Sequence, residues 1–417
     1  MTDATLLLRH ARELLTLDAD LDPRDPWSPS SLGIIPDGAV AVCGDRVVAV
    51  GRTDDVERAI SLRPKAIVLE VGDAVLCPGL VDPHTHALFA GDRAGEFSQR
   101  VRGDGYAEIA ARGGGIASTV RAVRGSDDAA LTAGLRARLD RMRAYGTTTV
   151  EVKTGYALDL AHELRCLEIL GRFAEVVPTF LPLHAVPPER RGEPDGRARF
   201  LDEVLRVWLP AVLAQGAARF IDAYVDATGF SVAEAEPVLR AALARGLRAR
   251  LHLGQFADVG GAALAASLGA ASADHLEHLD DDGARALAAA GVVGVLLPGA
   301  ALSLGQSMPD ARRLRELGMD LALGTDCNPG TSHTDALPLM ATLAVRQMGM
   351  STPEAWHAIT RVAARALDLP DRGVIRVGAR ADLAVLDLAS WEALPYAFGG
   401  PRARHVVLGG RALSLAC

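Results

Sequence analysis

The stretch Pro78-Gly79-Leu80-Val81-Asp82-Pro83-His84-Thr85-His86 begins a new structural unit in the chain. Proline and glycine mark its boundary, and the short apolar run that follows ends in His-x-His. Because side chains alternate along a strand, His84 and His86 would project from the same face, about 7 Å apart. Two imidazoles placed in this way can bind one metal ion if other strands supply further ligands.

Downstream of this stretch, strand candidates alternate with helical stretches, a rhythm typical of βα units and a parallel sheet. Eight strands are predicted, at 80–84, 147–152, 178–183, 219–224, 248–253, 272–275, 292–297 and 320–325. Helices are predicted between them, among others at 129–145, 160–173, 231–245 and 281–290, with Ser231 and Asp281 as N-caps. Eight such units over about 290 residues predict an α/β fold of the (β/α)8 TIM-barrel class.

Two segments interrupt the rhythm after predicted strands. Residues 87–126 follow the first strand, and residues 298–308 form a predicted loop after the seventh. In TIM barrels the segments after strands build the active site, so both segments are expected to cover it.

Both ends of the chain read as short strands instead of βα units. Segments 37–42 and 46–50 flank a Gly44-Asp45 turn, which is a hairpin signal, and further strands are predicted at 66–71, 381–386 and 405–408. We therefore expect residues 1–75 and 375–417 to form one small β-sandwich-like domain. The TIM-barrel domain, residues 76–374, would be inserted between its two halves.

The composition is that of a globular protein, because 49% of the 417 residues are hydrophobic and 23% are charged. The 44 basic and 52 acidic residues give a formal net charge of -8, which argues against nucleic acid or an acidic membrane as a partner. Five scattered cysteines fit a reducing compartment. Neither a signal peptide nor a run of roughly 20 apolar residues is found, so a cytoplasmic protein is expected.

Five of the eleven histidines fall at the predicted carboxyl ends of barrel strands, where TIM barrels carry their chemistry. They are His84, His86, His184, His252 and His275, and Asp326 ends the eighth strand. Three imidazoles and a carboxylate suit zinc or another divalent metal such as iron. We therefore predict one metal with His84, His86, His252 and Asp326 as its ligands, and a bound water activated by it. The other six histidines are expected to be solvated or packed.

Longer motifs surround these residues, at 78–86, 90–93, 113–116, 118–121, 151–156, 184–188, 273–279, 325–331 and 378–385. On these motifs the chain resembles the amidohydrolase superfamily and, within it, the imidazolonepropionase family, over nearly its full length. The resemblance implies hydrolysis of a cyclic amide, 4-imidazolone-5-propanoate, to N-formimidoyl-L-glutamate in histidine degradation. It also implies a homodimer.

The resemblance further implies roles for single residues. Asp326 would take a proton from the metal-bound water, and His275 would stabilise the oxyanion or move protons. Substrate would be held by Arg93, Tyr156, His184, Gln255, Asn328, Gly330 and Thr331. Arg93 can pair with a carboxylate through two N–H groups, and the loop at 328–331 could add backbone N–H donors and a hydroxyl. The competing interpretations are a solvated Arg93, a packed Tyr156 and a plain turn at 328–331.

Two other functions compete with this interpretation. A mononuclear deaminase of a nucleobase-like ring typically carries His-x-x-Glu after the fifth strand, but residues 252–255 read His-Leu-Gly-Gln and glutamine cannot transfer a proton. A barrel that binds a ligand without catalysis would not need the complete ligand set. Amidohydrolases with two metals bridge them through a carboxylated lysine after the fourth strand. Residues 220–226 contain no lysine, so a second metal is disfavoured. Lys153, one of only two lysines, is expected to form an ion pair with Glu151 or a neighbouring residue inside the barrel.

Overall fold

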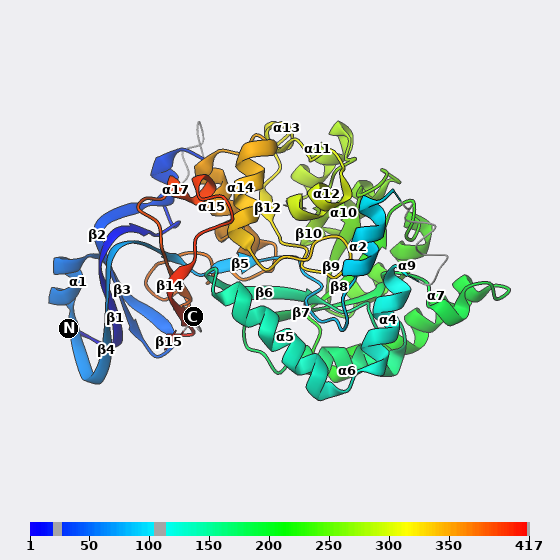
Figure 1. The fold of residues 1–417 in the computed structure, drawn as a ribbon, viewed down its shortest axis with the longest axis horizontal. Coiled ribbons are helices and arrows are strands. Elements are labelled where there is room, and N and C mark those ends of the chain that lie inside the picture. The colour runs from blue at the N-terminus through cyan, green and yellow to red at the C-terminus, as the bar shows by residue number, and fades with distance from the viewer. Residues whose placement is uncertain (20–26, 104–113, 415–417) are drawn as a thin grey trace.

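A computed structural model describes residues 1–19, 27–103 and 114–414 (Figure 1). They form an eight-stranded parallel sheet and a separate seven-stranded sheet built from both ends of the chain. The two sheets lie at opposite ends of an elongated molecule, and most helices surround the eight-stranded one (Figure 1). This arrangement confirms the predicted fold class.

The eight-stranded sheet is the predicted barrel, with its strands in sequence order. Its members are β5 (Leu80–Asp82), β6 (Thr147–Lys153), β7 (Val176–Leu183), β8 (Phe220–Val225), β9 (Arg248–Leu253), β10 (Ser272–His275), β11 (Val293–Leu296) and β12 (Leu321–Leu323). Beyond β5 and β12 the barrel closes through two backbone bonds of 3.0 Å, from Asp326 N to His84 O and from His86 N to Cys327 O. Because all strands are parallel, their carboxyl ends meet at one rim.

The four named helices are present as α5 (Asp128–Arg143), α6 (Leu160–Leu170), α9 (Val232–Leu243) and α11 (Asp281–Ala289). Ser231 is the N-cap of α9, as predicted, and the structure adds a capping box with Glu234. The prediction for α11 was wrong by one residue: Asp280 is the N-cap and accepts from Gly283 N at 2.7 Å. Asp280 has the extended backbone that an N-cap needs, whereas Asp281 already belongs to the helix.

The remaining helices of the barrel region are mostly short. They are α2 (Ala94–Val101), α4 (Ile116–Gly125), η2 (Pro188–Arg190), α7 (Gly196–Glu203), η3 (Val204–Trp208), α8 (Leu209–Gln215), α10 (Gly261–Leu268), α12 (Pro298–Leu304), α13 (Ala311–Glu316), α14 (Leu337–Gln347), α15 (Thr352–Ala358) and α16 (Arg361–Arg365). The loop predicted at 298–308 is therefore wrong in part, because α12 occupies most of it. Pro298 suits the first helical turn, and Ala300 and Ala301 bury the inner face of this helix. The segment 87–126 carries α2 and α4, and its residues 104–113 lie outside the described ones.

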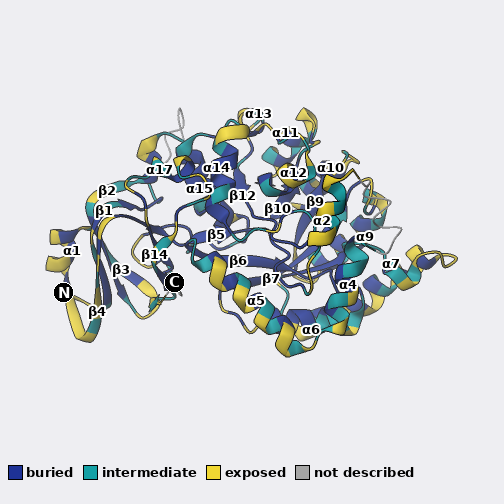
Figure 2. Cartoon of the chain, in the orientation of Figure 1, coloured by how far each residue is buried: buried dark blue, intermediate teal, exposed yellow. Residues whose placement is uncertain are grey.

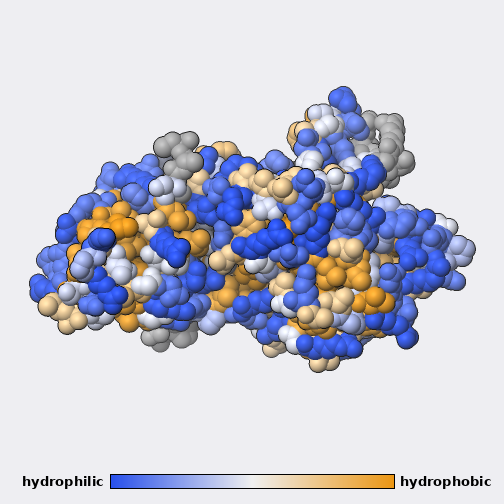
Figure 3. All heavy atoms as spheres, turned by 90° about the horizontal axis from the view of Figure 1, so that it is seen from below, coloured by the Kyte–Doolittle hydropathy of each residue, from blue (hydrophilic) through white to orange (hydrophobic). Residues whose placement is uncertain are grey.

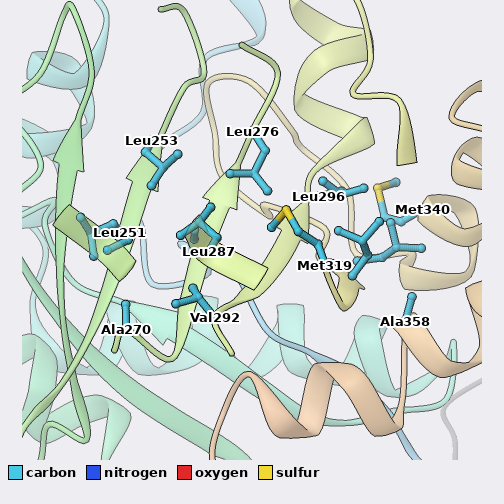
Figure 4. Packing of buried hydrophobic residues seen from close by; sticks show 14 of the residues in the cluster. Leu251, Leu253, Ala270, Leu276, Leu287, Val292, Leu296, Met319, Met340 and Ala358 are labelled. Atoms are coloured by element: carbon cyan, nitrogen blue, oxygen red, sulfur yellow. The ribbon is translucent and has the colours of Figure 1, made fainter. Parts of the chain in front are cut away.

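Strand alternation decides what faces the barrel interior. Leu251 and Leu253 of β9 belong to the hydrophobic cluster between strands and helices, shown in Figure 4. The residues between and before them, His252 and Arg250, therefore point into the barrel. Figure 2 shows the same division: the strands are buried, and the helices expose their outer sides.

The sheet of the two chain ends has the order β15-β14-β13-β4-β1-β2-β3. Its strands are β1 (Thr2–Leu15), β2 (Ile34–Cys43), β3 (Arg46–Arg52), β4 (Ile60–Pro78), β13 (Leu383–Leu386), β14 (Ala403–Leu408) and β15 (Arg411–Leu413), with η1 (Pro29–Leu32), α1 (Thr53–Ala59) and α17 (Ala393–Tyr396) beside them. The sheet folds back on itself, because Val47 N donates to Ala379 O at 3.0 Å and Leu6, Val47 and Leu383 share one core cluster. The domain boundaries near 75 and 375 stay a prediction.

The face shown in Figure 3 is mainly hydrophilic, with separate hydrophobic patches over the terminal sheet and over the barrel. Among the described residues, no helix combines the length and the apolar character needed to cross a membrane.

Candidate active site

Four predicted ligands converge at the carboxyl rim of the barrel. His84, His86 and His252 are buried, and one ring nitrogen of each lies within 4.8 Å of the others. His86 Nε2 is 3.2 Å from His252 Nε2, and Asp326 Oδ1 is 3.6 Å from His84 Nε2 and 3.7 Å from His86 Nε2. Ligands at roughly 2.0–2.2 Å from one metal, in tetrahedral geometry, stand about 3.3–3.6 Å apart. The spacing of the three histidines therefore fits a metal site, and Asp326 lies beside two of them.

A buried carboxylate stands behind two of the imidazoles. His84 Nδ1 forms a hydrogen bond of 2.7 Å with Asp274 Oδ2, and His252 Nδ1 lies 3.1 Å from Asp222 Oδ2 as a close ion-pair contact. A proton on each Nδ1 leaves Nε2 with its lone pair directed at the common point. Among the described residues His84 Nε2 is buried without a hydrogen-bond partner, an arrangement that a metal would satisfy.

The charge states suit the same role. Burial lowers the pKa of His84 and of His86 well below the usual histidine range, so both rings are neutral and can donate a lone pair. Burial also raises the pKa of Asp326 to about 6, which shows how poorly this carboxylate is solvated and how much a bound cation would stabilise its charge.

Two of the site residues are held in strained backbone. Asp326 has a φ of 50° and His275 a φ of 85°, values in the left-handed region that non-glycine residues rarely adopt. Such positions cost about 1–3 kcal/mol each and persist where the surrounding structure determines them. Here they turn two side chains inward at the ends of strands. His275 Nδ1 lies 3.6 Å from Glu277 Oε1, so a buried carboxylate stands behind this imidazole.

A cavity of about 980 Å³ opens above the four ligands. It is lined by most of the predicted site residues: His86, Arg93, Tyr156, His184, His252, Gln255, His275, Asp326, Asn328 and Thr331. His84 and Gly330 are the two that do not line it. His84 lies deeper in the barrel, and Gly330 lies behind Arg93.

Arg93 occupies a prepared position in the cavity wall. Its Nε donates to Glu96 Oε2 at 2.7 Å, and Glu96 Oε1 accepts from Gly115 N and Ser118 Oγ, both at 3.1 Å. A Cβ at Gly330 would lie only 2.3 Å from Arg93 Nη1, so the absence of a side chain there makes room for the guanidinium. The terminal N–H groups of Arg93 remain available to an anion.

His184, Tyr156 and Gln255 line the wall near His86. The His184 ring stacks on His86, with centroids 5.0 Å apart, and its Nδ1 donates to Gly155 O at 3.0 Å. Burial lowers the pKa of His184 to about 3, so its Nε2 is an acceptor. Gln255 Oε1 accepts from the Tyr224 hydroxyl at 3.1 Å, which leaves the amide NH2 group to face the cavity.

The loop after β12 departs from expectation. Gly330 N and Thr331 N both donate to Asn328 Oδ1, at 2.7 Å, and therefore do not offer their N–H groups to a ligand. Asn328 Nδ2 donates to Asp326 O at 2.7 Å, so the side chain of Asn328 braces the loop. Thr331 keeps its hydroxyl near the site, 3.4 Å from Asp326 Oδ2.

Sequence reasoning missed several residues around the site. Phe97, Arg100, Arg191, Tyr224 and Gln306 also line the cavity, and Asp222, Asp274 and Arg250 lie under the metal ligands. Asp222, Asp274 and Arg250 could have been found in the sequence, because each is a charged residue within an otherwise apolar strand. The six histidines outside the rim lie elsewhere, as predicted; His278 and His333 are exposed, and His357 is buried against Ser31. Lys153 pairs with Glu151 as predicted, with Nζ 2.9 Å from Oε1.

Comparison with known proteins identifies two levels of relationship. The pattern of the Amidohydrolase family matches residues 111–413. The chain is 43% identical over 419 residues to an imidazolonepropionase of Symbiobacterium thermophilum, covering 99% of this chain and 97% of that protein. It is 44% identical over 416 residues to an imidazolonepropionase of Anaeromyxobacter dehalogenans, covering 98% and 96%.

Solved structures of more distant proteins share the architecture. An adenosine deaminase from Xanthomonas campestris with bound zinc superposes with a TM-score of 0.72 at 20% identity, covering 99% of this chain and 93% of that one. An atrazine chlorohydrolase from Arthrobacter aurescens complexed with zinc gives a TM-score of 0.65 at 18% identity, covering 98% and 95%. At such identities the likeness concerns the fold alone.

Proposed function

The chain belongs to the imidazolonepropionase family of amidohydrolases, and from this premise we propose that it hydrolyses 4-imidazolone-5-propanoate to N-formimidoyl-L-glutamate. Water adds to the ring carbonyl, the carbonyl carbon–nitrogen bond breaks, and the freed carboxylate becomes part of the glutamate product. The observation that carries the proposal is the convergence of His84, His86, His252 and Asp326 below a cavity whose wall holds Arg93.

One divalent metal would be held by those four residues. Three imidazoles and one carboxylate suit zinc or iron, and the two structural relatives above contain zinc. When bound, the metal supplies a water of lowered pKa and polarises the carbonyl.

The cavity can orient an imidazolone ring with an anionic tail. The terminal N–H groups of Arg93 match the propanoate carboxylate. His184 Nε2 can accept a ring N–H, and the Gln255 amide can donate to a ring acceptor. These groups come from three separate segments, which follow β5, β7 and β9, so the ring would be held over the metal ligands in one orientation.

Two residues are placed to move protons. Asp326 directs Oδ1 at the histidines, and its Oδ2 lies near the Thr331 hydroxyl and can accept a proton from the attacking water. His275, backed by Glu277, can donate a hydrogen bond to the developing oxyanion and then a proton to the departing nitrogen. Glutamine at position 255 cannot carry the proton that a deaminase passes to its leaving amine, which disfavours deamination.

The direct test follows the loss of ultraviolet absorbance of 4-imidazolone-5-propanoate with the purified chain and measures its metal content. His252→Ala should abolish both metal binding and turnover. His278→Ala, which removes an exposed histidine, is the matched control and should preserve both. A metal-loaded wild type without turnover contradicts the function, and metal retention by His252→Ala contradicts the ligand assignment. A homodimer and a cytoplasmic location stay predictions.

A further inference from the structure

A cluster of charged side chains fills the barrel interior directly below the metal ligands, and the proposed chemistry does not use it. Its members are Glu151 and Lys153 of β6, Asp222 of β8, Arg250 of β9 and Asp274 of β10, each fully shielded from solvent. Inward positions of TIM-barrel strands are ordinarily filled by branched apolar residues. A wholly ionic layer at this level therefore needs a reason.

Lys153 stands at the centre of this layer. Its Nζ lies 2.9 Å from Glu151 Oε1, 2.8 Å from Asp222 Oδ2 and 3.6 Å from Asp274 Oδ2. Burial opposes its charge, but Asp222 and Glu151 outweigh burial and raise the pKa of Lys153. Arg250 contacts only one of the two aspartates, with Nη2 3.2 Å from Asp274 Oδ2.

Both aspartates that touch Lys153 also touch a metal ligand. Asp222 Oδ2 reaches His252 Nδ1, at 3.1 Å, and Asp274 Oδ2 reaches His84 Nδ1, at 2.7 Å. A carboxylate in this place favours a proton on Nδ1 and leaves Nε2 for the metal. Lys153 is thus linked through one carboxylate each to two proposed metal ligands, His252 and His84.

The charges explain why a lysine is required. Three carboxylates and two cations give the layer a formal net charge of -1. Without Lys153 the net charge would be -2, and both aspartates would lose the ammonium group that fixes their carboxylates in place. An imidazole whose far nitrogen has no fixed carboxylate beside it can turn, so its Nε2 would no longer be held toward the metal.

We propose that Lys153 is a positioning residue of the metal centre: it fixes the carboxylates of Asp222 and Asp274 behind His252 and His84, so that both rings present Nε2 to one cation. This inference rests on the proposed metal-dependent function and deepens it. Lys153 does not line the cavity, and its effect passes through the two aspartates.

The test replaces Lys153 with methionine, which has a similar length and no charge. Its dissociation constant for zinc, measured by competition with a chelator, should rise about 10- to 100-fold. The visible absorption spectrum of the Co²⁺-substituted variant should change, because the ligand geometry changes. Arg372→Met is the control: it removes a largely buried arginine that bonds Thr149 Oγ1 near the other end of β6, and should leave both readouts unchanged. An unaltered zinc affinity and cobalt spectrum in Lys153→Met would overturn the proposal.

A second variant covers the case in which Lys153→Met does not fold. Lys153→Met combined with Asp222→Asn removes one charge of each sign and preserves the net charge of the layer. Its zinc dissociation constant should remain at least tenfold above that of the wild type, and a wild-type constant refutes the role of Lys153. If the wild type itself binds no metal, the proposed function fails instead, so the two failures are distinguishable.

Discussion

Substituting alanine for Gly330 should weaken substrate binding, although the new methyl group itself would not contact the substrate. The new Cβ would lie 2.3 Å from Arg93 Nη1 and 2.9 Å from Arg93 Cζ, far inside the roughly 3.5–4.0 Å of a favourable contact. The guanidinium is the end of a flexible side chain, so we expect it to move and the loop backbone to stay. Gly330 does not have a positive φ, and alanine introduces no backbone strain there.

The size of the effect follows from what Arg93 would lose. Its Nε is held by Glu96, so the displaced terminal N–H groups are those that face the carboxylate of the substrate. A hydrogen bond to a charged group contributes about 1.5–3 kcal/mol, which corresponds to roughly a 10- to 150-fold loss in kcat/KM. The loss should fall mainly on KM, because the propanoate tail is bound equally before and during the reaction. The free energy of unfolding should change by less than about 1 kcal/mol.

A double-mutant cycle checks this reasoning. Kinetics of Gly330→Ala, Arg93→Met and the double variant are compared in the ultraviolet assay, with urea unfolding as the stability control. Because Gly330 acts through Arg93, the double variant should be no worse than Arg93→Met alone. Wild-type kinetics in Gly330→Ala, or fully additive losses in the double variant, would refute the argument.

Three further outcomes are expected. Glu163→Gln should lower the free energy of unfolding by about 1–3 kcal/mol and raise KM. The reason is that Glu163 Oε1 accepts from the N–H groups of Ala157 and Leu158, in the loop that carries Tyr156. Urea unfolding measures the first effect and the kinetic assay the second. Burial lowers the pKa of His357 to about 4, so its ring stays neutral in the folded state above that pH. The unfolded chain takes up this proton already near pH 6.5. The free energy of unfolding should therefore fall by up to about 3 kcal/mol as the pH falls from about 6.5 to 4. His357→Gln should remove that part of the slope, and parallel curves of unfolding free energy against pH would contradict it. Ser231→Ala should cost about 1 kcal/mol by removing a helix cap, with unchanged kinetics, as thermal unfolding and the same assay would report.

The strand pattern and the rim of the barrel could be predicted because both depend on local sequence. Buried parallel strands read as short apolar runs between helices, and the polar residue that ends such a run lies at the carboxyl rim. His252 and Asp326 were placed by this reasoning alone, before any geometry. The order of the strands then brought together residues that are up to 242 positions apart, as the His84–Asp326 contact shows.

Other features depended on geometry that spacing does not encode. The loop after β12 looked like a cradle of free N–H groups, but the Asn328 side chain folds back and accepts two of them. Gly330 resembled a ligand-contacting residue, yet its function in the structure is to leave space for Arg93. In both cases the residue type was informative, but its contact could not be predicted. Asn328 turns back onto its own loop, and Arg93 lies on a segment far from Gly330 in the sequence.

The ionic layer shows why the ligands could be found more easily than their support. Lys153 and Glu151 share one face of β6, and Arg250 and His252 share one face of β9, so the period of two places charge inside the barrel wherever it places a ligand at the rim. Replacing buried ion pairs by apolar residues is often neutral or stabilising, so stability alone does not account for this layer. Its connection to His84 and His252 through Asp274 and Asp222 does, because a metal ligand needs a fixed proton on its far nitrogen. The barrel interior is charged here because carboxylates on the strands below orient the two imidazoles, and each buried carboxylate needs a buried cation beside it.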